Sequence, residues 1–188
     1  MPDLKVSHSD KEPTAIDLRH PWVAGVLAWL VPGWGHYYQR RYLKALIFFF
    51  CIVPIFVAGC ALGSSRDTGI ARNVYWSKRQ GDWRFWWLAQ APLGIVVIPS
   101  WMQAWQINAG QQPIFKRFMA PPHRFHNDTK GVSPTIDEVR QKLPHYELGT
   151  YLVVIAGLMN LLVIFDAVDG PFAGRRKVVE IKEVEDKG

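Results

Sequence analysis

Two histidines and a carboxylate lie within six residues in the segment His123-Arg-Phe-His126-Asn-Asp128. Imidazole nitrogens and carboxylate oxygens are ligands of zinc, which in proteins usually takes three or four such groups. No cysteine joins this segment, and only the distant His145 offers a further imidazole. A metal site needs its full set of ligands. We therefore interpret the segment as a solvated loop, keep His123 and His126 only as alternative metal candidates, and expect no cofactor.

Two amide side chains, Gln90 and Asn160, lie inside strongly apolar stretches of the sequence. In a membrane, such amides face the interior of a helix bundle and form hydrogen bonds between helices, each contributing roughly 1 kcal/mol. The alternative is that they line a path for a transported solute. One amide in each stretch is too little for a proton relay, so we favour packing.

Two carboxylates, Asp166 and Asp169, follow the last apolar stretch. They are three residues apart and so share one face of a helix. They also lie near its C-terminus, where the helix dipole disfavours negative charge. This penalty predicts a compensating cation, and we expect Asp166 or Asp169 to pair with Arg19 or Arg84. The alternative is that both carboxylates face water.

Four apolar blocks must position these side chains. Each contains about the 20 residues that a helix needs to cross the hydrocarbon core of a bilayer. They predict an all-α membrane bundle with about four transmembrane helices, at 22–38, 42–63, 85–105 and 148–168. We expect one membrane domain over 21–171, between polar tails at 1–20 and 172–188.

The longest polar loop of this bundle covers residues 106–147. Within it, Thr135-Ile-Asp-Glu138 has the spacing of a capping box, in which each side chain satisfies the other's free backbone donor. The loop should therefore contain a short helix at about 135–143.

Composition separates the possible environments. A soluble surface helix keeps a polar stripe, and the segments at 45–58 and 151–165 have almost none. The net charge is +6, and basic residues stand beside the apolar blocks at Arg40-Arg41 and at 175–177. That placement favours a lipid bilayer with anionic head groups as the partner, and no nucleic-acid motif is present. A protein partner or a homo-oligomer is also possible.

Four spans place both termini on one side of the membrane. The two tails and the loop at 64–84 then carry 13 of the 22 Lys and Arg residues. The positive-inside rule therefore favours cytoplasmic termini.

The segment Pro32-Gly-Trp-Gly-His-Tyr-Tyr38, followed by Arg40-Arg41, resembles the proline-glycine-x-glycine-histidine-x-tyrosine hairpin of the two-transmembrane-helix domain and of related uncharacterised small bacterial membrane proteins. The resemblance extends from about residue 22 to 56. Gln39 and Arg40 stand where a glycine is frequent in that family, and Ala45 where a second one is. The positions that match are Pro32, Gly33, Gly35, His36, Tyr38 and Arg41. The resemblance implies a membrane hairpin in the bacterial inner membrane, with no assigned activity.

The same residues have a direct physical interpretation. Proline interrupts a helix, and Gly33 and Gly35 permit close approach of backbones. Backbone groups freed inside a membrane must find partners within the protein, and His36 and the tyrosine hydroxyls can supply them. We favour this structural role over ligand binding.

No serine nucleophile elbow, phosphate loop, kinase set or metalloprotease helix is present. The sequence does not identify a biochemical activity. Our first hypothesis is a non-enzymatic membrane component that binds a partner or organises its surroundings. The alternatives are a membrane-embedded enzyme that uses the 106–147 loop and a small oligomeric transporter.

Overall fold

The computed structural model describes residues 20–79, 82–109, 111, 114–122 and 136–169. This part of the chain is mainly helical, with irregular loops and one antiparallel hairpin of two-residue strands. In chain order the elements are α1 (Pro21–Leu30), α2 (Trp34–Tyr38), α3 (Tyr42–Leu62), β1 (Lys78–Arg79), β2 (Asp82–Trp83), α4 (Trp86–Gln90), the 3₁₀ helix η1 (Ala91–Val97), α5 (Ile98–Asn108), α6 (Ile136–Lys142) and α7 (Tyr146–Asp169).

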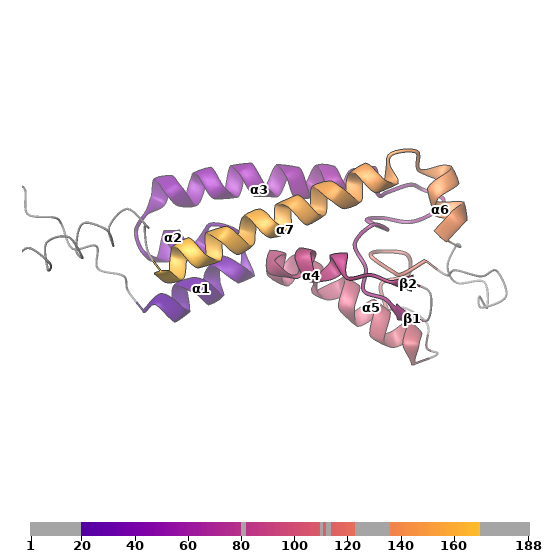
Figure 1. Ribbon diagram of the computed structural model, residues 1–188, viewed down its shortest axis with the longest axis horizontal. Helices are drawn as coiled ribbons and strands as arrows, with labels where there is room; N and C mark the ends of the chain where they lie inside the picture. The colour runs from indigo at the N-terminus through magenta and orange to yellow at the C-terminus, as the bar shows by residue number, and fades with distance from the viewer. Residues whose placement is uncertain (1–19, 80–81, 110, 112–113, 123–135, 170–188) are drawn as a thin grey trace, which may run out of the picture.

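Two long helices, α3 and α7, lie side by side and antiparallel along the length of the molecule (Figure 1). They contain 21 and 24 residues, which corresponds to about 32 and 36 Å at 1.5 Å per residue. Both are long and apolar enough to cross a membrane. They touch closely at Gly59, where a Cβ atom would lie 2.9 Å from the carbonyl oxygen of Gly149 and 2.7 Å from Val153. Glycine at this crossing therefore lets the two backbones approach each other.

The first predicted span is divided into two short helices that fold back on each other. The helix α1 ends at Leu30, and after the turn at Pro32-Gly33 the helix α2 returns alongside it. Gly33 has a φ angle of 89°, which favours glycine. A Cβ atom on Gly35 would lie 2.2 Å from the carbonyl oxygen of Ala24. These two glycines therefore make the reversal sterically possible.

The third predicted span is broken in the same way. The helix α4 runs inward, η1 turns at Gly94 with a φ angle of 72°, and α5 runs back toward the end from which α4 came (Figure 1). A hydrogen bond of 2.8 Å from the indole Nε1 of Trp87 to the hydroxyl of Ser100 joins the two arms. We call α1–α2 the N-terminal hairpin and α4–η1–α5 the central hairpin.

The expectation of about four transmembrane helices is met in part: among the described residues, α3 and α7 are long and apolar enough to cross a membrane, whereas the predicted spans at 22–38 and 85–105 are each divided into shorter helices. Four straight spans would put the loop at 64–84 and the loop at 106–147 on opposite sides of the bundle. In the structure these loops touch, because the backbone N–H of Met119 donates to the carbonyl of Ile70 at 2.9 Å. The cause is the turn at Gly94, which returns the chain to the end of the bundle from which α4 starts.

The end of the bundle where α3 stops is closed by a packed cap of loops. Val74 and Tyr75 are fully buried there, although the sequence indicated only a polar loop. Arg72 is buried as well, and burial lowers its pKa to about 10. That value keeps the guanidinium charged at neutral pH. The short helix expected at 135–143 is confirmed as α6.

Candidate functional site: the Asp166 cluster and the central junction

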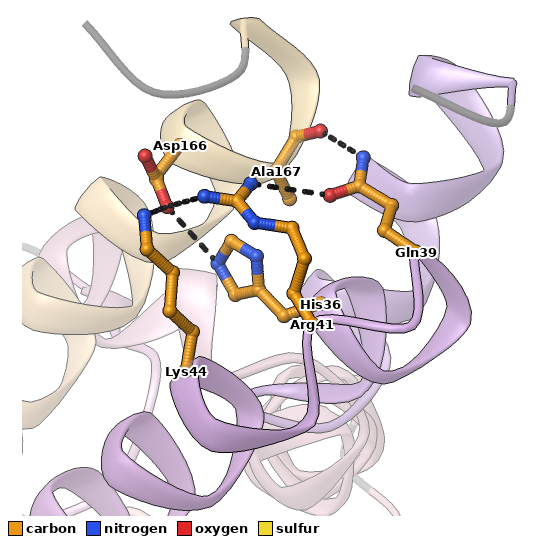
Figure 2. Close-up of polar contacts among 6 residues, drawn as sticks. All are labelled: His36, Gln39, Arg41, Lys44, Asp166 and Ala167. Carbon is orange, nitrogen blue, oxygen red and sulfur yellow. Dashed lines mark hydrogen bonds and ion pairs between the residues drawn. The ribbon is translucent and has the colours of Figure 1, made fainter. Parts of the chain in front are cut away.

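A single carboxylate near the end of α7 gathers three nitrogen-bearing side chains from the N-terminal hairpin and the start of α3 (Figure 2). The Asp166 Oδ2 atom lies 3.1 Å from the ammonium of Lys44, 3.4 Å from the Nε2 atom of His36 and 3.7 Å from the guanidinium of Arg41. We call these four residues the Asp166 cluster. It joins segments that lie more than 120 residues apart in the sequence.

The turn between α2 and α3 positions the donors of the cluster. The amide of Gln39 donates to the backbone carbonyl of Ala167 at 2.7 Å, and Arg41 donates to the side-chain oxygen of Gln39 at 3.4 Å (Figure 2). The carbonyl of Ala167 lies in the last turn of α7, where helical carbonyls have no partner within the helix. Gln39 therefore fixes the end of α7 while it orients Arg41 toward Asp166.

Most of the side chains of the Asp166 cluster are shielded from solvent. The side chain of His36 is fully buried, those of Arg41 and Asp166 are 14% and 20% exposed, and that of Lys44 is 42% exposed. An acid at a helix C-terminus is unfavourable, and two cations at this distance compensate for it. The side chain of His36 also packs against Phe48, with 5.0 Å between the ring centroids. The cluster thus links α7 by electrostatic contacts to the N-terminal hairpin and to the start of α3.

The pairing predicted for the aspartates, with Arg19 or Arg84, is not the contact that Asp166 makes in the structure. Asp166 does meet an arginine, but it is Arg41 from the hairpin motif. Arg19 lies outside the described residues, and Asp169 is exposed one turn beyond Asp166. Lys44 and Gln39 were not singled out by the sequence. Four spans put the turn at 39–44 at the opposite end from Asp166, so no signal in the sequence pointed to either.

Arg84 lies at the other end of α7. Its guanidinium donates to the hydroxyl of Tyr146 at 3.0 Å and to the carbonyl of Asn73 at 3.2 Å, and it stacks 4.1 Å from the ring centroid of Tyr75. Tyr146 is the first residue of α7, about 30 Å along the helix from Asp166. Arg84 therefore belongs to the cap and cannot reach either aspartate.

Midway along the bundle the two hairpins meet, and Asn160 of α7 binds both. Its amide nitrogen donates to the carbonyl of Pro92 at 2.6 Å and to the carbonyl of Ala28 at 3.1 Å. In an unbroken helix, the carbonyl of Ala28 would accept from the backbone nitrogen of residue 32. That residue is Pro32, which has no N–H. Asn160 thus satisfies a carbonyl that the proline leaves without its helical donor.

The central hairpin also has backbone carbonyls that lack a helical donor. Its non-helical turn at Gly94 interrupts the backbone ladder, and the indole Nε1 of Trp29 donates to the carbonyl of Ala91 at 3.2 Å. A Cβ atom on Gly94 would lie 1.7 Å from the carbonyl oxygen of Trp29. We call the contact of Ala28 and Trp29 with Ala91, Pro92, Gly94 and Asn160 the central junction.

The two amides that the sequence placed in apolar stretches, Gln90 and Asn160, have different surroundings. The role predicted for Asn160, hydrogen bonding between helices, agrees with its contacts in the structure. Gln90 is buried beside the central junction, close to Gly157 of α7. Its side-chain oxygen has no hydrogen-bond partner among the described residues.

The remaining residues singled out in the sequence are a motif tyrosine and the candidate metal ligands. Tyr38 packs on the small core formed by Ala24, Ala28 and Ala167. His123 and His126 lie outside the described residues. In the part of the chain that the structure describes, no three His, Cys, Asp or Glu side chains lie together as metal ligands.

These features define a helical protein with two helices long and apolar enough to cross a membrane. The chain belongs to a family of unknown function, DUF6677, whose model matches residues 23–178. No curated protein and no solved structure matches the chain.

Proposed function

We propose that this protein is an integral membrane protein in which α3 and α7 cross the bilayer and the two hairpins each enter it from opposite sides and return. The observation that carries the proposal is the exposed apolar surface of the long helices. Only 17% of the most apolar stretch of α3 and 39% of that of α7 are buried within the chain. A core helix of a soluble protein would be mostly covered, because large exposed apolar surfaces are rare in soluble monomers.

The central junction supports the same proposal. Irregular backbone at membrane depth is tolerated only where protein or a water-filled cavity surrounds it. Here the side chains of Asn160 and Trp29 satisfy carbonyls of both broken segments. A water-exposed turn would not need such donors.

Within this class, we infer a non-enzymatic membrane component that binds a partner or organises its surroundings. The donors inside the bundle are engaged in joining its elements: Asn160 and Gln39 bind backbone carbonyls, and Arg41 and Lys44 bind Asp166. The resemblance of the hairpin motif to small bacterial membrane proteins suggests the inner membrane. Both described ends of the chain, at residues 20 and 169, lie at one end of the bundle (Figure 1), which is compatible with two cytoplasmic termini.

One observation favours a small transporter as the second candidate. Discontinuous helices that meet near the bilayer midplane are typical of transporter binding sites, and Gln90 leaves a buried oxygen beside this junction. A flux of Na⁺, K⁺ or protons into proteoliposomes, abolished by Gln90→Leu, would favour this candidate. An absence of flux in wild-type proteoliposomes would favour the non-enzymatic membrane component instead.

Membrane insertion is tested by alkaline carbonate extraction. We expect the full-length protein to remain in the membrane pellet and to need detergent for purification. Recovery as a soluble monomer would refute the proposal. Purification in mild detergent then tests the inferred role, which requires a partner in stoichiometric amount.

A further inference from the structure

A second polar surface lies in the cap, away from the Asp166 cluster. Two loops, the one that follows α3 and the one that follows α5, enclose an open cavity of about 760 Å³. Its polar lining comes from Ser64, Ser65, Arg66, Lys116 and Arg117. None of the described residues that line it is acidic. Ile70, Phe115 and Phe118 supply an apolar wall.

The two loops are fastened to each other, so the cavity is already formed. Ser65 and Gly69 exchange two backbone hydrogen bonds of 2.9 Å, which close the first loop. Arg117 donates to the carbonyl of Asp67 at 2.7 Å. A Cβ atom on Gly69 would lie 2.4 Å from the carbonyl oxygen of Arg117, so the loops are in close contact. A preformed site spares a ligand the cost of ordering the loops.

The three basic side chains of this cavity differ in whether they already have a partner. Arg117 is tied to the neighbouring loop. Arg66 and Lys116 are exposed and form no ion pair with any other residue that the structure describes. The nearest acid in sequence, Asp67, is not among the lining residues. An anion in the cavity would therefore meet two cations that form no ion pair with a described carboxylate.

The position of the cavity indicates which anion it fits. Ser64 lies two residues after the end of α3, so the cavity lies where α3 would leave the hydrocarbon. Ile70 and Phe115 are 59% and 42% exposed beside the cations. Basic and aromatic side chains at this depth are typical of contact with lipid head groups. A soluble anion would gain nothing from the apolar wall.

We propose that this cavity binds the phosphate head group of an anionic membrane lipid, with Arg66 and Lys116 at the phosphate and the apolar wall along the first acyl carbons. The proposal rests on the proposed membrane insertion of α3. It adds a specific site to the general attraction between basic residues and the bilayer.

The test uses the full-length protein in detergent and short-chain phosphatidylglycerol as the probe, with binding measured by native mass spectrometry and by thermal shift. Short-chain phosphatidylcholine and inorganic phosphate are the comparison ligands. We expect wild type to retain phosphatidylglycerol and the double variant Arg66→Gln/Lys116→Gln to bind it more weakly, by about fivefold for each charge removed. These two side chains form no ion pair within the described chain, so their loss should not unfold the cap.

Lys142→Gln is the matched control, because it removes an exposed lysine from α6 at the same end of the molecule. It should bind like wild type. Equal binding by the double variant, or an equal loss in the control, would overturn the proposal. Preference for inorganic phosphate would mean a soluble-anion site and would overturn it too. Carbonate extraction is done first, so that a failure of membrane insertion is recognised separately.

Discussion

At the scale of single residues, the most informative side chain is Asp166. The helix dipole predicts that an acid in the last turn needs a compensating charge, and this much follows from the sequence. The identity of the cation does not. It depends on which end of the bundle the turn at 39–44 occupies, and hence on the direction of α3. Arg41 was identified as a motif residue. Its contact with Asp166 could not be predicted, because four spans place the turn at 39–44 at the opposite end of the bundle.

Removing the charge of Asp166 should destabilise the protein. In Asp166→Asn, Arg41 and Lys44 keep their positions without a carboxylate between them. We expect a loss of about 2 kcal/mol in the free energy of unfolding, between the values for exposed and fully buried ion pairs. Thermal unfolding in detergent, followed by tryptophan fluorescence, measures it.

Asp169→Asn is the matched control, because it removes the same charge one turn farther along α7, at an exposed position. Its effect should be smaller. The double variant Asp166→Asn/Lys44→Met should lose less than the sum of the single losses, since residues in contact are not additive. Equal losses in Asp166→Asn and Asp169→Asn would argue against the cluster.

At the scale of elements, the broken helices explain why some segments were predictable and others not. The helices expected at 42–63 and 148–168 are found at Tyr42–Leu62 and Tyr146–Asp169. Each is a continuous apolar run, and hydropathy measures such runs directly. The segments that form the N-terminal and central hairpins are apolar enough to suggest spans as well, but hydropathy carries no information on direction. Pro32 marked an interruption, whereas the reversal depends on partners that are distant in sequence, Asn160 above all.

The side-chain amide of Asn160 should stabilise the contact between the two hairpins. In Asn160→Leu, the carbonyls of Ala28 and Pro92 lose their side-chain donor inside the bundle. We expect a loss of about 1–2 kcal/mol in the free energy of unfolding. Asn160→Asp keeps the size of the side chain and replaces the donor with an acceptor, so it should be at least as destabilising. If Asn160→Leu unfolds like wild type, the junction does not depend on this donor.

Gly94 should tolerate no side chain. Alanine there would have to adopt a φ angle of 72° and place its Cβ against the carbonyl oxygen of Trp29. Strain and steric overlap together should cost more than about 3 kcal/mol, seen as a large fall in melting temperature. Ile95→Ala is the control, because Ile95 is exposed and adjacent. A Gly94→Ala protein as stable as this control would contradict the close contact of the two hairpins.

At the scale of the whole molecule, the two reversals change the distribution of charge. In the proposed topology, in which only α3 and α7 cross the membrane, the segments 1–44 and 170–188 would belong to one side and the segment 63–145 to the other. Each side then contains eleven of the 22 Lys and Arg residues. The bias of 13 in 22 that favoured cytoplasmic termini depends on assigning the loop at 64–84 to the same side as the termini. The positive-inside rule therefore gives no orientation here, and an experiment has to supply it.

Single cysteines distinguish the two topologies directly. On a background of Cys51→Ala and Cys60→Ala, three variants each introduce one exposed cysteine: His20→Cys, Arg66→Cys and Gln111→Cys. Right-side-out membrane vesicles are treated with a membrane-impermeant maleimide before and after permeabilisation. The structure brings the loops around residues 66 and 111 together at one end of the bundle, because Met119 bonds to Ile70 and Arg117 to Asp67. We expect Arg66→Cys and Gln111→Cys to react from the same side and His20→Cys from the other. Four straight spans require His20→Cys and Arg66→Cys to react together, with Gln111→Cys apart, and that outcome would refute the re-entrant hairpins. The cysteines that react before permeabilisation lie on the outer side of the membrane, so they also show the orientation of the termini.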